Sequence, residues 1–433
     1  LCRDRSREVQ TSIRSTVSAV VITVISAMPA VTYAGGDEYD ELKNQVEMLQ
    51  KQLEQVQQAL KKYEEKSATK DEVIKAKEEI KQEVTKDVEN TISEGMTPDT
   101  LVHLAGYADV GYTSAKDEDG SFRIGSFSPI FHYQYRDLFM LEAELEIELE
   151  SDGETEVALE YLTIDWFMND YSALVAGKFL SPIGQFRQNL HPSWINKMAS
   201  APPGFGHDGA APISDVGFQV RGGFPLGNVR NNYAVYVSNG PELHAELEDG
   251  EFELEGVEAE GFGEDRDGNK VFGGRYGFIP FAGLEIGLSA ATGKAAVTNI
   301  NGEGLDEIGN SRDYDVLGAD FAWQHKMFDV RGEFVQTKVG DGPSDAGASD
   351  GAKWKTWYLQ AAYQFPGLKL EPVLRYADFK SPHPSESVKQ WGGGLNYLFA
   401  HHLIAKLNYL SNDVDEHSHT PESLWQLQLA YGF

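Results

Sequence analysis

The strongest constraint on the fold is an alternation of apolar and polar residues that begins at Leu101 and continues to Phe433. Sixteen segments with a period of two residues can be marked in this part of the chain, and that period is typical of β-strands. The connections alternate in length, from short ones such as 136–137 to long ones such as 182–212 and 239–269. This pattern predicts an all-β transmembrane barrel of about 16 antiparallel strands, with tight turns at one end and long loops at the other.

The two faces of the segment 138–150 predict which side meets water. Leu141 and Leu145 lie on an apolar face, and the opposite face carries glutamates. A charged row of this kind needs a wet interior, whereas the apolar row suits lipid. The same alternation gives the pore-lining candidates Glu142, Glu144, Glu146, Glu148, Lys178, Arg221, Arg275, Arg331, Arg375 and Lys406, with Asp215, Asp320, Glu333 and Glu371 as further acidic candidates. The alternative for each residue is that it is merely a solvated part of the wet wall. A β-bulge would also turn some of these side chains to the other face, and the irregular alternation within 155–168 suggests that such bulges occur.

Two segments precede the expected barrel. A basic start, an apolar run over 17–31 and the small Ala34 are typical of a secretory signal peptide over 1–34, with a membrane anchor as the alternative. Between Tyr39 and Tyr63 apolar residues recur at spacings of 3 and 4, which predicts a coiled coil within 35–98. One chain cannot bury this narrow stripe, so we expect self-association; a lone solvated helix is the alternative. The barrel domain is then 99–433.

Charge and composition exclude several functions. The net charge of −31 disfavours binding to nucleic acid, and the single cysteine, Cys2, excludes a disulfide scaffold. The chain has no phosphate-binding glycine loop and no hydrolase motif, so we expect no enzyme, no catalytic residue and no cofactor. The histidines at 401–402 and 417–419 are expected to be solvated, so no metal site is assigned. The acidic segment 239–269 should repel itself and stay mobile unless divalent cations bind it, such as those that bridge lipopolysaccharide.

The chain resembles a known class of membrane protein. Phe433, preceded by Tyr431, Leu429 and Leu427, resembles the C-terminal signal of Gram-negative outer-membrane barrels, and 177–186 is similar to the phosphate-selective porin family. The overall plan resembles trimeric sixteen-stranded porins with an N-terminal periplasmic coiled coil. The resemblance implies a homotrimer in the bacterial outer membrane, in contact with its lipid and lipopolysaccharide, with the coiled coil in the periplasm.

By the same resemblance, the third loop, residues 182–212, folds into the barrel and narrows it; an external cap is the alternative. This loop is rich in proline and glycine and poor in acids. Its constriction candidates are Arg187, His191, Trp194, Lys197, His207 and Asp208. We expect Arg187 and Lys197 to favour anions at the narrowest point, unless the glutamate row of 138–150 neutralises them.

Two functions remain open from the sequence. The first is a porin, a passive channel for small hydrophilic solutes or inorganic ions. The second is a structural anchor or cell-wall tether with a non-conducting barrel. Sixteen strands favour the channel, because barrels of this size enclose an aqueous lumen unless a plug fills it.

Overall fold

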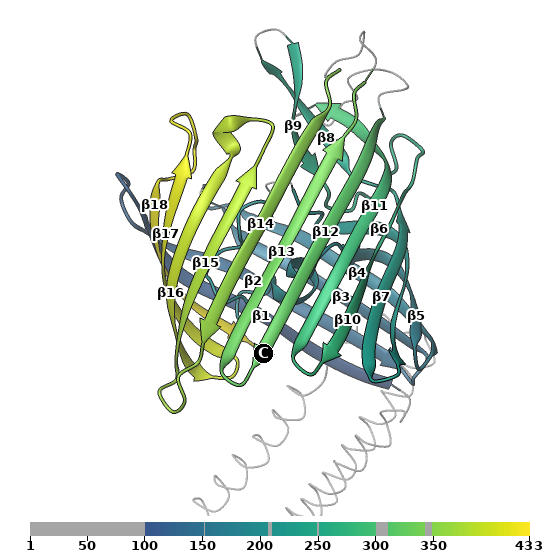
Figure 1. The fold of residues 1–433 in the computed structure, drawn as a ribbon, viewed down its shortest axis with the longest axis horizontal. Coiled ribbons are helices and arrows are strands. Elements are labelled where there is room, and N and C mark those ends of the chain that lie inside the picture. Colours follow the sequence, from purple (N-terminus) through teal and green to yellow (C-terminus); the bar gives the residue numbers. More distant parts are fainter. Residues whose placement is uncertain (1–99, 151, 207–209, 249–250, 300–310, 343–348) are drawn as a thin grey trace, which may run out of the picture. The chain divides into compact units, whose positions relative to one another are not determined.

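The computed structural model describes residues 100–433 except 151, 207–209, 249–250, 300–310 and 343–348. Sixteen of its strands form a closed antiparallel β-barrel, which confirms the predicted barrel (Figure 1). Within these residues, no helix is long and apolar enough to span a bilayer. The expected signal peptide and coiled coil lie outside the described part of the chain.

The barrel strands follow one another around the wall in chain order, except that β7 pairs directly with β10. They are β1 (Thr100–Ala115), β2 (Ser121–Tyr135), β3 (Phe139–Leu149), β4 (Thr155–Asn169), β5 (Ser172–Leu180), β6 (Ser214–Leu226), β7 (Val229–Ser238), β10 (Val271–Phe281), β11 (Leu284–Asn299), β12 (Arg312–His325), β13 (Phe328–Val339), β14 (Ala352–Tyr363), β15 (Leu370–Lys380), β16 (Val388–Ala400), β17 (Leu403–Val414) and β18 (Ser423–Gly432). Three smaller elements lie in loops: α4 (Phe186–Leu190), the hairpin of β8 (Glu242–Glu248) and β9 (Glu251–Glu258), and a 3₁₀ turn at Pro384–Glu386.

The barrel closes where β1 pairs with β18. Two backbone hydrogen bonds join Gly106 and Phe433, with N–O distances of 3.0 and 2.9 Å. Gly106 has φ of +155°, and a Cβ atom there would lie 2.5 Å from the Ser128 carbonyl oxygen and 2.6 Å from the Phe433 ring. Glycine is therefore needed at this position, because a side chain would collide with the backbone of β2 and with the Phe433 ring beside the seam.

The outer face of the barrel carries apolar side chains that remain exposed in the isolated chain. Leu141 is 38% exposed, Trp166 44% and Leu427 52%. The glutamate face of β3 points the other way: Glu144 is 1% exposed and accepts a hydrogen bond of 2.7 Å from the buried Tyr107 hydroxyl. An apolar belt outside and acids inside agree with a barrel that faces lipid.

The expected irregularity in the fourth segment is a β-bulge in β4. The β3–β4 register shifts between Glu144 and Leu145, and the consecutive residues Glu160 and Tyr161 are both buried. Beyond the bulge, Tyr161 directly faces Glu144. The bulge therefore restores the inward phase for the rest of β4.

Lys178 does not lie on the inner face, so its placement among the pore-lining candidates is wrong. It stands opposite Leu162 of β4, which is 41% exposed on the outer side. An inward Lys178 would turn its neighbours Val175 and Phe179 toward lipid, but these are 0% and 2% exposed and belong to an apolar cluster inside the barrel. The inward and outward faces of β5 are thus the opposite of those predicted, because part of the interior is as apolar as the lipid side.

The acidic segment 239–269 also differs from its expected mobility, because much of it folds as the β8–β9 hairpin. Leu243 and Ala245 are fully buried, and Leu254 and Val257 are 5% exposed. β8 pairs in parallel with β11, and His383 in the β15–β16 loop is hydrogen-bonded to the Leu254 carbonyl oxygen at 2.8 Å. Alternate apolar residues give this acidic segment a face to bury, and that burial offsets the charge repulsion.

The outward placement of Lys178 on β5 can be tested with cysteine labelling in lipid vesicles, after Cys2 is changed to Ser. We expect Arg221→Cys to react with a polar maleimide, because Arg221 faces inward and is 42% exposed. Lys178→Cys should resist that reagent and react with a lipid-phase probe, as should the control Leu141→Cys. Rapid labelling of position 178 by the polar reagent would contradict the outward placement.

Candidate functional site

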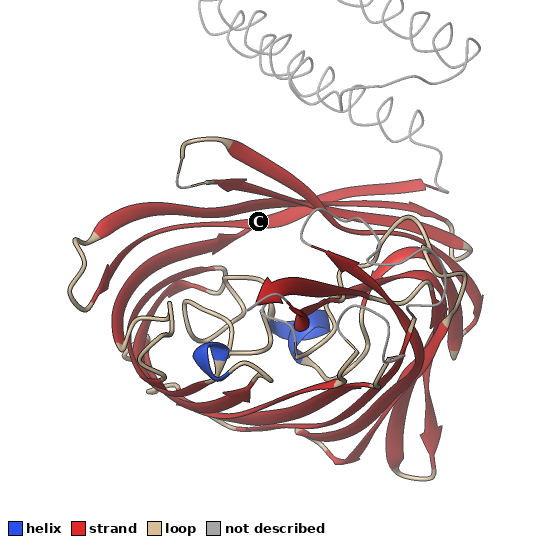
Figure 2. Cartoon of the chain, turned by 90° about the horizontal axis from the view of Figure 1, so that it is seen from above, coloured by secondary structure: helices blue, strands red, loops and turns tan. Residues whose placement is uncertain are grey.

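The third loop lies inside the barrel and touches most of its inner wall (Figure 2). Its backbone and side chains are held by the inward-facing residues Ser289, Glu333, Thr337, Thr356, Arg375, Asn396, Lys406, Asn408 and Gln426, from β11 and every strand from β13 to β18. Each contact fixes one short stretch of the loop. The loop is therefore packed inside the barrel and does not form an external cap.

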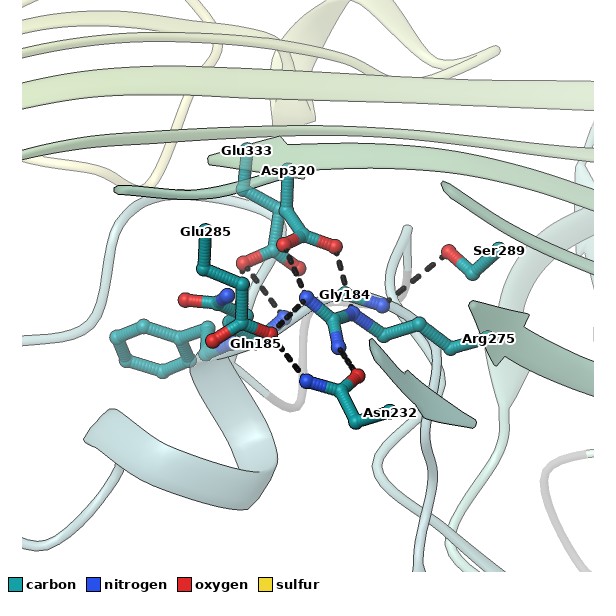
Figure 3. A network of polar contacts seen from close by, with 9 residues as sticks. Gly184, Gln185, Asn232, Arg275, Glu285, Ser289, Asp320 and Glu333 are labelled. Carbon is teal, nitrogen blue, oxygen red and sulfur yellow. Dashed lines mark hydrogen bonds and ion pairs between the residues drawn. The ribbon is translucent and has the colours of Figure 1, made fainter. Parts of the chain in front are cut away.

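The start of the loop is fixed by Glu333 of β13 (Figure 3). The Glu333 carboxylate accepts hydrogen bonds from the backbone N–H groups of Gln185 and Phe186, at 3.2 and 3.0 Å. Gly184 has φ of +75°, and a Cβ atom there would lie only 1.6 Å from Glu333 Oε1. Its N–H donates to Ser289 Oγ at 3.3 Å. The close approach of loop and wall thus depends on a glycine.

Next to this contact, Arg275 of β10 organises a second polar group (Figure 3). Its guanidinium donates to both oxygens of Asp320, at 2.8 and 2.6 Å, to Glu285 at 2.9 Å and to the Asn232 amide oxygen at 3.0 Å. A planar guanidinium suits such multiple contacts. Arg275 therefore crosslinks β7, β10, β11 and β12 from inside and is not a free charge in the pore.

The far part of the loop is held by two buried cations. Arg375 is 0% exposed and donates to the carbonyl oxygens of Ser200 and Ala201, at 2.8 and 3.2 Å. Lys406 is 1% exposed and donates to the carbonyl oxygen of Met198 at 3.1 Å and to that of Ser193. Hydrogen bonds to charged donors are about twice as strong as neutral ones, so these two residues clamp the loop backbone.

Lys197 and two further inner cations, Arg221 and Arg331, are paired with acids. Lys197 Nζ lies 2.7 Å from Glu371 Oε2, and Arg221 lies 2.5 Å from Asp165. Arg331 pairs with Asp329 on the same strand. The charges of these three cations are balanced locally, so Lys197 does not act as the free positive charge that the sequence suggested.

Of the other loop candidates, His191 and Trp194 lie at the β1 and β18 side of the barrel, Arg187 is buried, and two fall outside the described residues. Arg187 is 8% exposed. The His191 ring packs edge-on against Tyr107 and lies 3.6 Å from Glu144. Trp194 packs over Gly432, where a Cβ atom would come within 2.7 Å of the indole. His207 and Asp208 fall in the gap of the described residues at 207–209.

Two cavities lie between the loop and the end of the barrel with short turns. Their volumes are about 490 and 970 Å³, and Asn189 and Glu285 line both. The larger is bordered by Trp194 and by the paired charges Lys197, Glu371, Arg331 and Asp329. Its wall therefore carries cations and anions side by side.

The alternation in the sequence gives the inward side of most charged residues, including the acids Asp320 and Glu371, but it does not show which residues pair. The candidates named from the sequence do not include Asp329, Glu285 or Asn232, because none of them lies in a motif or a charge cluster. The alternation would have placed Asp329 on the inner face with Arg331, two residues away. No sequence signal points to the Lys197–Glu371 pair, whose members are 174 residues apart.

The clamps can be tested by removing them together. In Arg375→Met combined with Lys406→Met, the loop carbonyls lose their charged donors, each hydrogen bond of this kind contributing about 1.5–3 kcal/mol. We expect a lower unfolding temperature, faster protease cleavage within 193–201 and a larger, noisier single-channel conductance. Lys389→Met is the matched control, since Lys389 is exposed and pairs with Asp413 at 3.5 Å. An unchanged cleavage rate in the double variant would show that these cations do not hold the loop.

Comparison with known proteins agrees with the barrel. The model of the family "Phosphate-selective porin O and P" matches residues 284–433, which run from the start of β11 to Phe433. An anion-selective porin from Comamonas acidovorans superposes with a TM-score of 0.51 at 15% identity, over 77% of this chain and 100% of that one. OmpT of Vibrio cholerae in its trimer form gives 0.50 at 12% identity, over 77% and 100%.

No match was found among curated protein sequences. At these identities the structural matches establish the fold, and the family match adds sequence similarity over the last eight strands. The closed sixteen-stranded barrel with an internal loop and this match lead to one conclusion. The chain has the sixteen-stranded barrel fold of porins, and its residues 284–433 are similar to the phosphate-selective porin O and P family.

Proposed function

We propose that this porin is a trimeric, weakly selective channel for small hydrophilic solutes or ions, narrowed by the third loop. The observation that carries the proposal is the loop held inside the barrel by Glu333, Arg375 and Lys406 above cavities of about 490 and 970 Å³. A fixed loop beside open, polar space suits size-limited diffusion. The family match and the fold favour a channel over an enzyme, and we assign no catalytic role to any residue.

The charge arrangement supports weak selectivity. Lys197 and Glu371 form a pair at 2.7 Å and border the larger cavity together with the pair of Arg331 and Asp329. The fields of paired opposite charges largely cancel at the distance of a passing ion, and salt screens the remainder within about 8–10 Å. We therefore propose weak selectivity, seen as a small reversal potential in a salt gradient, in place of the anion preference expected from Arg187 and Lys197.

The selectivity proposal predicts opposite effects for the two members of one pair. Lys197→Gln leaves Glu371 unbalanced and should shift the reversal potential toward cations, whereas Glu371→Gln should shift it toward anions. The double variant should return close to the parent, because the net charge at the cavity is restored. Planar-bilayer recordings in a tenfold salt gradient measure this, with Lys389→Gln as the control.

Equal reversal potentials for the two single variants would refute the role of this pair. Complete absence of current from the folded parent would instead favour the alternative function, a structural anchor with a non-conducting barrel. The two results are distinguishable in the same recordings.

The trimer and the periplasmic coiled coil are further parts of the proposal. Their support is the heptad-like spacing between Tyr39 and Tyr63 and the fold shared with an outer-membrane protein solved in a trimer form. We expect the protein in mild detergent to have the mass of three chains, measured by light scattering with detergent correction. Deleting 37–95 should lower the temperature at which the trimer dissociates and leave the barrel folded. A monomeric mass for the undeleted protein would contradict the proposal.

A further inference from the structure

Two histidines face each other on the inner wall, near the short β2–β3 turn. His103 of β1 and His132 of β2 are directly opposite in register, and their Nδ1 atoms are 3.3 Å apart. The rings are stacked, with centroids 5.6 Å apart and planes inclined by 19°. Both share the inward phase of Tyr107 and Ser128, a buried pair that lies four residues away on each strand.

The other nitrogen of His132 has a carboxylate partner. Glu142 stands directly opposite His132 on β3, and its Oε1 lies 3.2 Å from His132 Nε2. The same oxygen accepts a hydrogen bond of 3.2 Å from the Tyr161 hydroxyl. A carboxylate at Nε2 favours the proton on that nitrogen, so Nδ1 of His132 presents its lone pair toward His103.

We propose that His103 and His132 bind a divalent transition-metal ion through their Nδ1 atoms, with Glu142 as the residue that positions His132. Two nitrogens at metal distances of about 2.0–2.1 Å and a tetrahedral angle are separated by about 3.3–3.4 Å, which matches the observed spacing. A metal-bound imidazole commonly donates its second N–H to a carboxylate, and Glu142 is in place for this contact.

The ligand set determines which ions fit. In the described part of the chain, no three histidine, cysteine or acidic side chains surround one point, so water would complete the coordination. Two imidazoles bind Cu²⁺ most tightly, then Ni²⁺ or Zn²⁺, over the oxygen-preferring Ca²⁺ and Mg²⁺. The tetrahedral spacing suits Zn²⁺ directly, whereas Cu²⁺, which prefers tetragonal coordination, would draw the two nitrogens slightly closer. The side chains of His132 and Glu142 are 27% and 23% exposed, and His103 is exposed, so an ion can enter from the lumen.

The site can be tested by copper binding to the full-length, tag-free protein at pH 7.5, where free imidazole is mostly neutral. We expect one Cu²⁺ per chain in a titration, and an electron paramagnetic resonance spectrum with couplings to two nitrogens. His103→Ala and His132→Ala should each weaken binding and leave one coupled nitrogen. Glu142→Gln should lower the affinity by about 10- to 100-fold and retain both nitrogens. His402→Ala, at the β16–β17 turn, is the matched control.

Three results would overturn the assignment: copper binding unchanged in either histidine variant, a parent spectrum with a single nitrogen, or a loss of binding in His402→Ala equal to that in His132→Ala. Heat-modified migration on gels identifies variants that fold, and His103→Gln replaces His103→Ala if the latter does not. The readout is metal binding and not current, so it stands whether or not the barrel conducts.

Discussion

The structure depends on one requirement, that every backbone hydrogen bond in a lipid-embedded sheet finds a partner within the protein. An open sheet would leave two unpaired edges in lipid, at a cost of several kcal/mol for each unsatisfied group. Pairing of β1 with β18 removes both edges. Once the barrel is closed, the strand period divides all side chains into those that meet lipid and those that meet the interior.

The interior then contains more charge than a protein core tolerates, and the third loop supplies hydrogen-bond partners for much of it. Arg375 and Lys406 are almost fully buried, yet they have loop carbonyl oxygens as partners. Glu333 accepts two N–H groups from the same loop. Barrel charges and loop backbone thus satisfy one another. The inner-wall charges that hold the loop in place are therefore neutralised or hydrogen-bonded by the loop itself.

How far the sequence predicts this arrangement depends on what each pattern encodes. A period of two identifies two faces, and for Arg221, Arg275, Arg331, Arg375 and Lys406 it gives the correct one. It fails for Lys178, because Val175 and Phe179 pack inside a partly apolar lumen and their hydrophobicity no longer marks the lipid side. Nor does any local pattern encode the pairing of Lys197 with Glu371, which only the folded loop brings together. The acidic hairpin was missed for the opposite reason, since its dense charge hid the alternate residues that it buries.

The β1–β18 seam also has a kinetic consequence. Asp109 and Gln428 touch across it although 319 residues separate them in the chain, so this contact demands one of the largest loop closures in the fold. Contacts of such long range form slowly. The strands that clamp the far part of the third loop, β15 to β17, lie just before β18 in the chain. The contacts that hold the loop and the contacts that close the barrel therefore both wait for the last strands of the chain.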